Sequence, residues 1–191
     1  NSINNNISRA KNLYSFYLTF IWYNKTMKIL ICGLPGSGKT WLAERLVRNL
    51  DNCAWFNADI VRKTENDWDF SPEGRSRQAN RMKNLADTES SKGKIAICDF
   101  VAPTKEIRES FNPDYLIWLD TVEKGRVVSE KKDELKDAKE LPFDIDTLEK
   151  SKEFEDTNNV FDPPLNAHKI IKSFLTDEEI KLLAEEIVPN V

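Results

Sequence analysis

The sequence has little sulfur and almost no histidine. It contains three cysteines, Cys32, Cys53 and Cys98, and one histidine, His168, among 191 residues. No two cysteines are spaced as a Cys-x-x-Cys metal or redox pair, and a single histidine cannot build a multi-histidine metal site. Zinc hydrolases and disulfide scaffolds are therefore excluded first. Because the cysteines lie in or beside apolar runs, we expect free thiols and a cytoplasmic location, and we interpret His168 as a surface or strand-edge residue.

An excess of positive charge is also missing. Lysine and arginine total 28 and aspartate and glutamate total 32, which gives a net charge of −4. A domain-wide basic field for gripping nucleic acid is therefore absent, although a local basic site stays open. The length, with 40% hydrophobic and 31% charged residues, is typical of one globular domain.

No hydrophobic run is long enough to cross a bilayer, so we expect no membrane partner. The longest candidate, residues 13–23, has eleven residues against the roughly 20 needed. It lies in a segment, 1–26, that carries three basic residues and no acids. This start imitates a secretory signal, but no small-x-small cleavage site follows it. We interpret 1–26 as a leader outside the functional domain of 27–191, with a packed N-terminal helix as the alternative.

A glycine-rich segment follows the first strongly apolar run. Residues 33–40 read GLPGSGKT and fit G-x-x-x-x-G-K-[ST] at every fixed position. Residues 28–32 before it predict a buried parallel strand, and residues 41–50 after it have helical spacing of apolar residues. Strand, loop and helix in this order are the context in which such a loop holds nucleotide phosphates.

Each position of the loop has an expected role in binding ATP and Mg²⁺. The glycines let backbone N–H groups approach phosphate oxygens, and the following helix adds its positive end. Lys39 would contact the β- and γ-phosphates, and Thr40 would offer its hydroxyl to magnesium. The expected ATP-binding residues are Gly33, Leu34, Pro35, Gly36, Ser37, Gly38, Lys39 and Thr40.

Strand and helix patterns alternate along the rest of the chain. Further strands are expected at 52–57, 94–100, 115–119 and, more weakly, 168–174. Helices are expected at 72–91 and 104–111, and a capping box at 176–179 opens a final helix through 188. This alternation predicts an α/β P-loop NTPase fold with three αβα layers and a mainly parallel sheet of about five strands.

Three acids fall near the carboxyl ends of the expected strands, where ligands bind in such sheets. Asp99 follows an apolar run and fits the pattern that holds magnesium through water. Asp120 is interpreted as a turn or cap residue. An acid at such a place can hold magnesium or act as a base, and it can also be a helix cap or a turn residue. Asp59 is the best candidate for chemistry, and the candidate magnesium ligands are Thr40, Asp59 and Asp99.

The segment between the second strand and the long helix is rich in arginine and aromatic residues. Residues 57–82 hold Arg62, Arg75, Arg77 and Arg81 together with Trp68 and Phe70. Arginine forks grip phosphate or sulfate oxygens and a ring stacks on a base, so this segment suits an anionic, nucleotide-like acceptor. A solvated basic helix with the phenylalanine in the core is the alternative.

These motifs together resemble the adenylylsulfate kinases (APS kinases), in particular their short, phage-like branch. The resemblance covers most of residues 27–165. It includes NADIVR where the family has D-G-D-x-V-R, DFSPEGR where it has G-F-S-x-x-D-R, and DFVAPTKEIR against F-I-S-P-x-R-x-x-R. LDT follows the next strand, and the later segments FEDTN and FDPP resemble the segment that covers the substrate.

The resemblance implies phosphorylation of the 3′-hydroxyl of adenylylsulfate to 3′-phosphoadenylylsulfate. Asp59 would face that hydroxyl, Arg62 and Arg75 would hold the phosphosulfate, and Phe70 would stack on adenine. The implied acceptor-binding residues are Asp59, Arg62, Phe70, Arg75, Gln78, Lys105 and Phe154. The implied catalytic residues are Lys39, Asp59 and Arg126.

The departures from the family pattern concern the acceptor side. Asn57-Ala58 replaces Asp-Gly, so one acid is missing, and Gln78 stands where an asparagine is usual. Asn80 and Lys105 each replace an arginine, Ala102 replaces a serine, and the Asp-Pro-Lys-Gly-Leu-Tyr lid element is absent. Residues 127–153 look inserted within a lid region at about 121–165, where Arg126 is the better candidate than Lys131 or Lys132 to contact the transferred phosphate.

Three functional hypotheses follow. The first is the APS kinase with a small-molecule nucleotide substrate. The second keeps the kinase but changes the acceptor to another nucleotide, a nucleic-acid end or a modified base. The third is a nucleotide-binding switch or scaffold that hydrolyses ATP slowly. A homodimer is left open for each.

Overall fold

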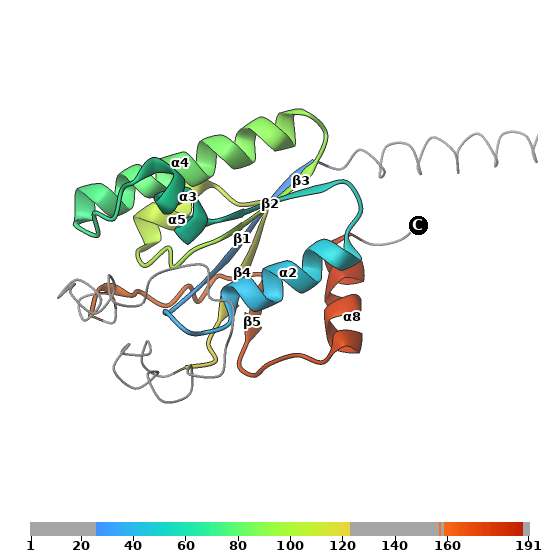
Figure 1. The fold of residues 1–191 in the computed structure, drawn as a ribbon. Helices are drawn as coiled ribbons and strands as arrows, with labels where there is room; N and C mark the ends of the chain where they lie inside the picture. Colours follow the sequence, from blue (N-terminus) through green and yellow to red (C-terminus); the bar gives the residue numbers. More distant parts are fainter. Residues whose placement is uncertain (1–25, 123–156, 158, 189–191) are drawn as a thin grey trace, which may run out of the picture.

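A five-stranded parallel sheet forms the centre of the molecule. The computed structural model describes residues 26–122, 157 and 159–188, and its strands have the order β2-β3-β1-β4-β5 (Figure 1). Their bounds are β1 Met27–Gly33, β2 Cys53–Asn57, β3 Ile95–Asp99, β4 Tyr115–Leu119 and β5 Lys169–Ile171. All four strand pairings are parallel, which confirms the predicted sheet.

Helices cover both faces of this sheet. They are α2 (Lys39–Asn49), α3 (Ala58–Glu65), α4 (Pro72–Ser91), α5 (Lys105–Phe111) and α8 (Asp177–Ile187). Figure 1 shows α3, α4 and α5 on one face and α2 and α8 on the other. The predicted three-layer αβα architecture of a P-loop fold is confirmed.

Two apolar clusters make the core, one on each face. In β1, Ile29 and Ile31 belong to the cluster under α2 and α8, whereas Leu30 and Cys32 belong to the cluster under α4 and α5. All seven residues of β1 are buried. A central parallel strand is covered on both sides, which is why residues 29–32 are continuously apolar rather than alternating; the preceding Lys28 is buried with its ammonium paired to Asp87.

The register brings the carboxyl ends of the strands to one edge. Asn57 of β2 pairs with Asp99 of β3, Ile31 of β1 pairs with the same Asp99, and Gly33 pairs with Leu119 of β4. The loops that leave these ends therefore meet at one side of the sheet, on the left in Figure 1. Parallel α/β sheets bind their ligands at this edge.

The helices and strands match the sequence expectations with two differences. An additional helix, α3, begins directly after β2, because Asn57 caps it: its Oδ1 accepts hydrogen bonds from the N–H groups of Asp59 and Ile60. The last strand is shorter than predicted and ends at Ile171.

The structure also bears on the membrane, cysteine and segment predictions. No helix in the described ranges is long and apolar enough to span a membrane. All three cysteines are free, with Cys32 and Cys98 buried and Cys53 half-buried, as predicted. The leader (all but its last residue) and the segment 127–153 lie outside the described residues.

Candidate active site

The phosphate loop joins β1 to α2 and needs glycine at two places. Gly33 has φ +148°, and a Cβ there would lie 2.5 Å from the carbonyl oxygen of Leu119. Gly38 has φ +91°, and a Cβ there would lie 2.8 Å from the ring of Phe174. Each of these two positions therefore requires glycine, because a residue with a Cβ would be strained there. The loop closes through a hydrogen bond from the Ser37 N–H to the Leu34 carbonyl (3.1 Å).

Two side chains fix the shape of the loop. The Lys39 ammonium donates to the Leu34 carbonyl (2.8 Å) across the loop. Thr121, just beyond β4, donates its hydroxyl to the Ser37 carbonyl (2.7 Å). The Ser37 hydroxyl is itself buried and has no hydrogen-bond partner within the described part of the chain. These hydrogen bonds therefore fix the backbone of the phosphate loop without a ligand.

Lys39 lies close to two acids. Burial lowers the pKa of its ammonium, and the carboxylates of Asp59 and Asp99 act in the opposite direction. Asp59 lies in the first turn of α3, and Asp99 is the last residue of β3. Both therefore lie at the carboxyl edge of the sheet. A cation at a phosphate loop that interacts with two carboxylates is suited to bridging the donor and acceptor sides of a transferred phosphoryl group.

Asp99, the last residue of β3, is the centre of a hydrogen-bond network. Its Oδ2 accepts from the Thr40 hydroxyl (2.8 Å) and from Asn57 Nδ2 (2.9 Å), and its Oδ1 accepts from Trp55 Nε1 (2.7 Å). Only 2% of the residue is exposed. This burial raises the pKa of Asp99 to about 6, against the lowering effect of the hydrogen bonds.

Asn57 uses both ends of its amide. Nδ2 donates to Thr40 Oγ1 (3.0 Å) as well as to Asp99, while Oδ1 caps α3. The sequence treats position 57 only as the place of a missing acid. In the structure it connects the phosphate loop, the end of β3 and the start of the helix that carries Asp59.

Asp59 stands in the first turn of α3, and its carboxyl interacts electrostatically with Lys39. The surrounding protein raises the pKa of its carboxyl, and the charges of Lys39 and then Arg62 act to lower it. The residue keeps more than a third of its surface exposed, so an acceptor can reach the carboxyl. A reachable carboxylate with a pKa above its ordinary value is suited to accept a proton.

Arg62 and Phe70 form a stacked pair beside this carboxyl. The guanidinium carbon of Arg62 lies 4.5 Å from the centre of the Phe70 ring. The same guanidinium is buried and donates through Nη1 to the carbonyls of Asp67 (3.1 Å) and Asp69 (2.9 Å). Arg62 therefore holds the 66–70 loop in place and positions the aromatic ring.

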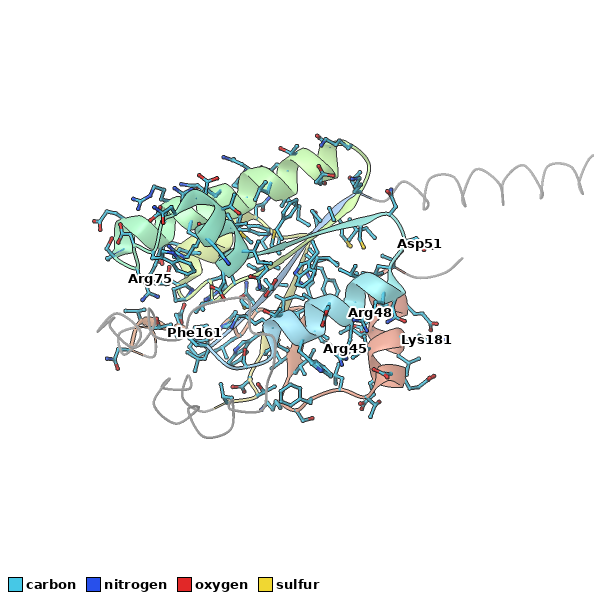
Figure 2. All side chains as sticks on the ribbon, in the orientation of Figure 1. Arg45, Arg48, Asp51, Arg75, Phe161 and Lys181 are labelled. Carbon is cyan, nitrogen blue, oxygen red and sulfur yellow. The ribbon has the colours of Figure 1, made fainter. Side chains whose placement is uncertain are left out.

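Arg75 connects α4 to Thr157, far along the chain. Its Nε donates to the carbonyl of Phe70 (2.6 Å), and its Nη2 donates to the hydroxyl of Thr157 (2.9 Å), which is buried. Figure 2 shows Arg75 and Phe161 at the same side of the molecule, the side of the carboxyl edge. Thr157 itself thus lies against the predicted acceptor region.

The remaining predicted acceptor residues have other contacts. Gln78 is buried and donates to the Ala58 carbonyl (3.1 Å), which ties α4 to the start of α3. Lys105 begins α5, is exposed and lies 3.6 Å from Glu109. Arg126 and Phe154 fall outside the described residues.

The other arginines of this region are paired with acids. Arg77 forms ion pairs with Asp67 (2.8 Å) and Asp69 (3.0 Å), and Arg81 pairs with the same Asp67 (2.7 Å). These guanidiniums hold the pKa of Asp67 well below its ordinary value. They fasten the 66–70 loop to α4, so their charge is largely neutralised by the protein itself.

Sequence reasoning missed three residues of this site. Trp55 and Asn57 support Asp99, and Arg108 is buried against the carbonyls of Ala102 (2.9 Å) and Pro103 (3.1 Å), where the β3–α5 loop leaves the sheet. The register of β2 with β3 could have indicated Asn57, since it stands opposite Asp99. Nothing in the sequence alone fixes that register.

The oxygen atoms at the phosphate loop fit magnesium. No group of three or more His, Cys, Asp or Glu side chains in the described ranges is arranged to hold a metal. Magnesium, however, takes one or two protein oxygens together with water and phosphate oxygens. The Thr40 hydroxyl, the buried Asp99 carboxylate and the more exposed Asp59 carboxylate are hard oxygen donors of this kind.

Comparison with known proteins gives a consistent family. A model of the adenylylsulphate kinase family matches residues 25–170. A probable adenylyl-sulfate kinase of Aeropyrum pernix is 34% identical over 95 residues, which cover 47% of this chain and 52% of that protein. The bifunctional enzyme CysN/CysC of Rhodopirellula baltica is 33% identical over 90 residues, 44% of this chain and 14% of that protein.

These matches span about half the length of the first relative and far less of the second. Among solved structures, the Mycobacterium tuberculosis APS kinase CysC in complex with AMPPNP and APS has a TM-score of 0.59 at 19% identity. The alignment covers 86% of this chain and 96% of that chain. At this identity the likeness shows the fold.

Proposed function

The chain belongs to the adenylylsulphate kinase family, and from this premise we propose that it transfers the γ-phosphoryl group of ATP to the 3′-hydroxyl of adenylylsulfate. In this reaction the 3′-oxygen forms a bond to the γ-phosphorus, the bond to the β-phosphate bridging oxygen breaks, and ADP leaves. The hydroxyl proton goes to a base. The products are ADP and 3′-phosphoadenylylsulfate.

The observation that carries the proposal is that Lys39 of the phosphate loop interacts electrostatically with two carboxylates, Asp59 and Asp99, which come from different elements. Asp99 belongs to the phosphate-loop side through its hydrogen bond to Thr40, and Asp59 stands on the separate helix α3. Phosphoryl transfer needs mainly positioning and charge neutralisation. Lys39 can stabilise the charge that develops between the donor on one side and the acceptor on the other.

The donor side is built from the phosphate loop. Its backbone N–H groups and Lys39 would hold the phosphates of ATP, and Thr40, Asp99 and Asp59 would hold magnesium through oxygen atoms. When bound, the ion neutralises phosphate charge. The buried free thiols fit a reducing cytoplasm, where ATP is available.

The acceptor side is built from α3, the 66–70 loop and the start of α4. Asp59 would accept the proton of the attacking hydroxyl. The Phe70 ring, held by Arg62 on one side, would offer its remaining surface to the adenine of the acceptor. Arg75, which contacts the carbonyl of Phe70, would grip the phosphosulfate. Phe154 and Arg126 would complete the site from the lid region.

The ion pairing of Arg77 and Arg81 supports a small-molecule acceptor rather than a nucleic acid. A nucleic-acid site requires cations that neutralise phosphates along a surface. Here both guanidiniums are bound to Asp67, and Arg77 also to Asp69. The acidic net charge of −4 acts in the same direction.

The test is transfer of label from γ-labelled ATP to adenylylsulfate, with Lys39→Ala and Asp59→Asn as variants. We expect labelled 3′-phosphoadenylylsulfate from the wild type and a loss of at least about 100-fold in each variant, the effect of removing one charged group that acts in the transition state. Lys92→Ala, an exposed position directly after α4, serves as the control. ATP binding without any labelled product from adenylylsulfate would contradict the proposed acceptor, and nucleosides and DNA ends would then be tried.

A further inference from the structure

Three polar side chains at the carboxyl edge form a closed triangle. Asn57 Nδ2 donates to Thr40 Oγ1 (3.0 Å) and to Asp99 Oδ2 (2.9 Å), and the Thr40 hydroxyl donates to the same Asp99 oxygen (2.8 Å). Asn57 and Asp99 are direct partners in the register of β2 with β3. The triangle therefore joins two neighbouring strand ends to the phosphate loop.

The environment of this triangle leaves no alternative orientation for the amide of Asn57. Its Oδ1 is occupied by the N–H groups of Asp59 and Ile60 at the start of α3, so Nδ2 must face Asp99. Asp99 is in turn fixed by Trp55 Nε1 on its other oxygen. Asn57 and Asp99 are both buried, with 8% and 2% of their surfaces exposed. Buried polar groups with one satisfied arrangement specify a single geometry.

The triangle contains one negative charge, and its hydrogen bonds can run in either direction. If the two strand ends exchanged their side chains, the amide at position 99 could donate to the carboxylate at position 57. The Thr40 hydroxyl could then turn to donate to that carboxylate and accept from that amide. The indole of Trp55 would still find an oxygen at position 99. The carboxylate at position 57 would still cap α3, since aspartate is as good a cap as asparagine, so every hydrogen bond would be kept.

Changing one position alone has a different consequence. With aspartate at both positions, two ionised carboxylates would face each other, and only uptake of a proton would put a hydrogen between them. With asparagine at both, two amide N–H groups face each other and the charge is lost. A buried polar group without its partner is costly, whereas an exchange of both partners is not.

We propose that Asn57 is a positioning residue that locks the Asp99 carboxylate, the Thr40 hydroxyl and the start of α3 into one unit, and that this unit requires one negative charge, on either strand end. The charge serves the cation that accompanies the donor phosphates, and the cap sets the place of Asp59. The inference rests on the proposed function for its kinetic consequence. Position 57 is also where the resembling motif D-G-D-x-V-R has an acid.

The test is a cycle of four proteins: wild type, N57D, D99N and N57D/D99N. We expect kcat/KM for the phosphoryl transfer to fall by about 10- to 100-fold in each single variant, as for the loss of one hydrogen bond to a charged group. In the double variant it returns to within about threefold of wild type, because the two changes are coupled. N84D, on the exposed face of α4, controls for the added charge.

Two further readouts separate this role from a purely structural one. The magnesium concentration for half-maximal binding of AMPPNP should rise at least about tenfold in D99N and return in the double variant. N57S keeps a capping side chain for α3 but removes both amide donors, so it should lower the thermal unfolding midpoint and also shift the magnesium dependence at a temperature where the variant is fully folded.

A double variant that is no better than D99N would overturn the inference, as would single variants that match the wild type. The binding readout uses no acceptor. If the wild type phosphorylates no acceptor while the magnesium dependence follows the cycle, the proposed function fails and the role of Asn57 stands.

Discussion

At the scale of single residues, the site depends on which hydrogen bonds each polar group already makes inside the protein. Arg62 and Arg75 both have a backbone carbonyl partner in the 66–70 loop, so they shape the acceptor region as well as charging it. Arg77, on a neighbouring face of the same helix as Arg75, is bound to two carboxylates. Side chains of one residue type therefore have different expected effects on substitution.

The first prediction compares Arg75 with Arg77. Arg75→Lys leaves a single ammonium that cannot reach both the Phe70 carbonyl and the Thr157 hydroxyl, so the KM for adenylylsulfate should rise about tenfold with the KM for ATP unchanged. Arg77→Lys is the matched control and should leave both KM values near those of the wild type. Steady-state kinetics with each substrate varied measures the effect, and equal changes in the two variants would contradict it.

The second prediction uses the titration of Asp99, whose pKa burial raises from 3.8 to about 6. An acid with a raised folded-state pKa favours the folded protein at low pH and loses that contribution as the pH rises from about 4 through about 6. The free energy of unfolding of the metal-free wild type should therefore fall with pH in this window relative to D99N, by up to about 3 kcal/mol.

Denaturant unfolding of both proteins in the presence of a chelator measures this difference. The pH range of about 4 to 8 covers the ordinary and the raised pKa of Asp99. Paired surface acids such as Asp67, whose pKa is lowered, act in the opposite direction but are common to both proteins. A difference that does not change with pH would show that Asp99 has an ordinary pKa.

At the scale of elements, the connection between α3 and α4 shows how a motif can be rearranged. Ser71 caps α4 by accepting from the Gly74 N–H (3.1 Å), and Asp69 Oδ1 accepts from the Ser71 N–H (2.9 Å). The motif G-F-S-x-x-D-R has glycine and aspartate where this chain has Asp69 and Gly74. The acid and the glycine have exchanged places, and the carboxylate occupies the space that a side chain at position 74 would need.

The third prediction follows from this space. A Cβ at Gly74 would lie 2.4 Å from both the Cγ and the carbonyl oxygen of Asp69. Glycine to alanine inside a helix normally stabilises by up to about 1 kcal/mol, but here we expect Gly74→Ala to destabilise by about 1–3 kcal/mol, as overpacking does. Urea unfolding measures it, with exposed Ser76→Ala on the same helix as the control. A stabilised variant would contradict the packing described.

The sequence predicts most elements of the sheet because their signals are local. The apolar run of β1, the phosphate loop and the capping box at Thr176 each lie within a few residues, and all appear as expected. Helix α3 was not predicted, since its cap, Asn57, also belongs to the preceding strand motif. The network of Trp55, Asn57 and Asp99 depends on strand register, which is a tertiary property and leaves no local pattern.

At the scale of the whole molecule, the two faces of the sheet divide the work. The α2 and α8 face anchors the phosphate loop, and the α3, α4 and α5 face carries the predicted acceptor residues, as Figure 1 shows for the helices. The sheet edge between them brings Lys39, Asp59 and Asp99 together. Binding of a nucleotide at this edge joins elements from both faces.

The fourth prediction is that the donor nucleotide stabilises the whole fold. A ligand that binds only the folded state at 100 times its Kd adds about 2.7 kcal/mol, which corresponds to an increase in Tm of roughly 5–10 °C for a domain of this size. We expect this increase with AMPPNP and magnesium in the wild type, measured by thermal unfolding. Lys39→Ala should lose most of it, and an equal increase in this variant would place the nucleotide elsewhere.

The central claim, that this edge phosphorylates adenylylsulfate, is tested most directly by the ratio of kcat/KM for adenylylsulfate to that for AMP. The two acceptors share adenine, ribose and phosphate and differ in the sulfate. We predict a ratio of at least about 10 in favour of adenylylsulfate, since one charge-assisted contact to the sulfate is worth about 10- to 100-fold. A ratio near one, or transfer to neither acceptor, would contradict the claim.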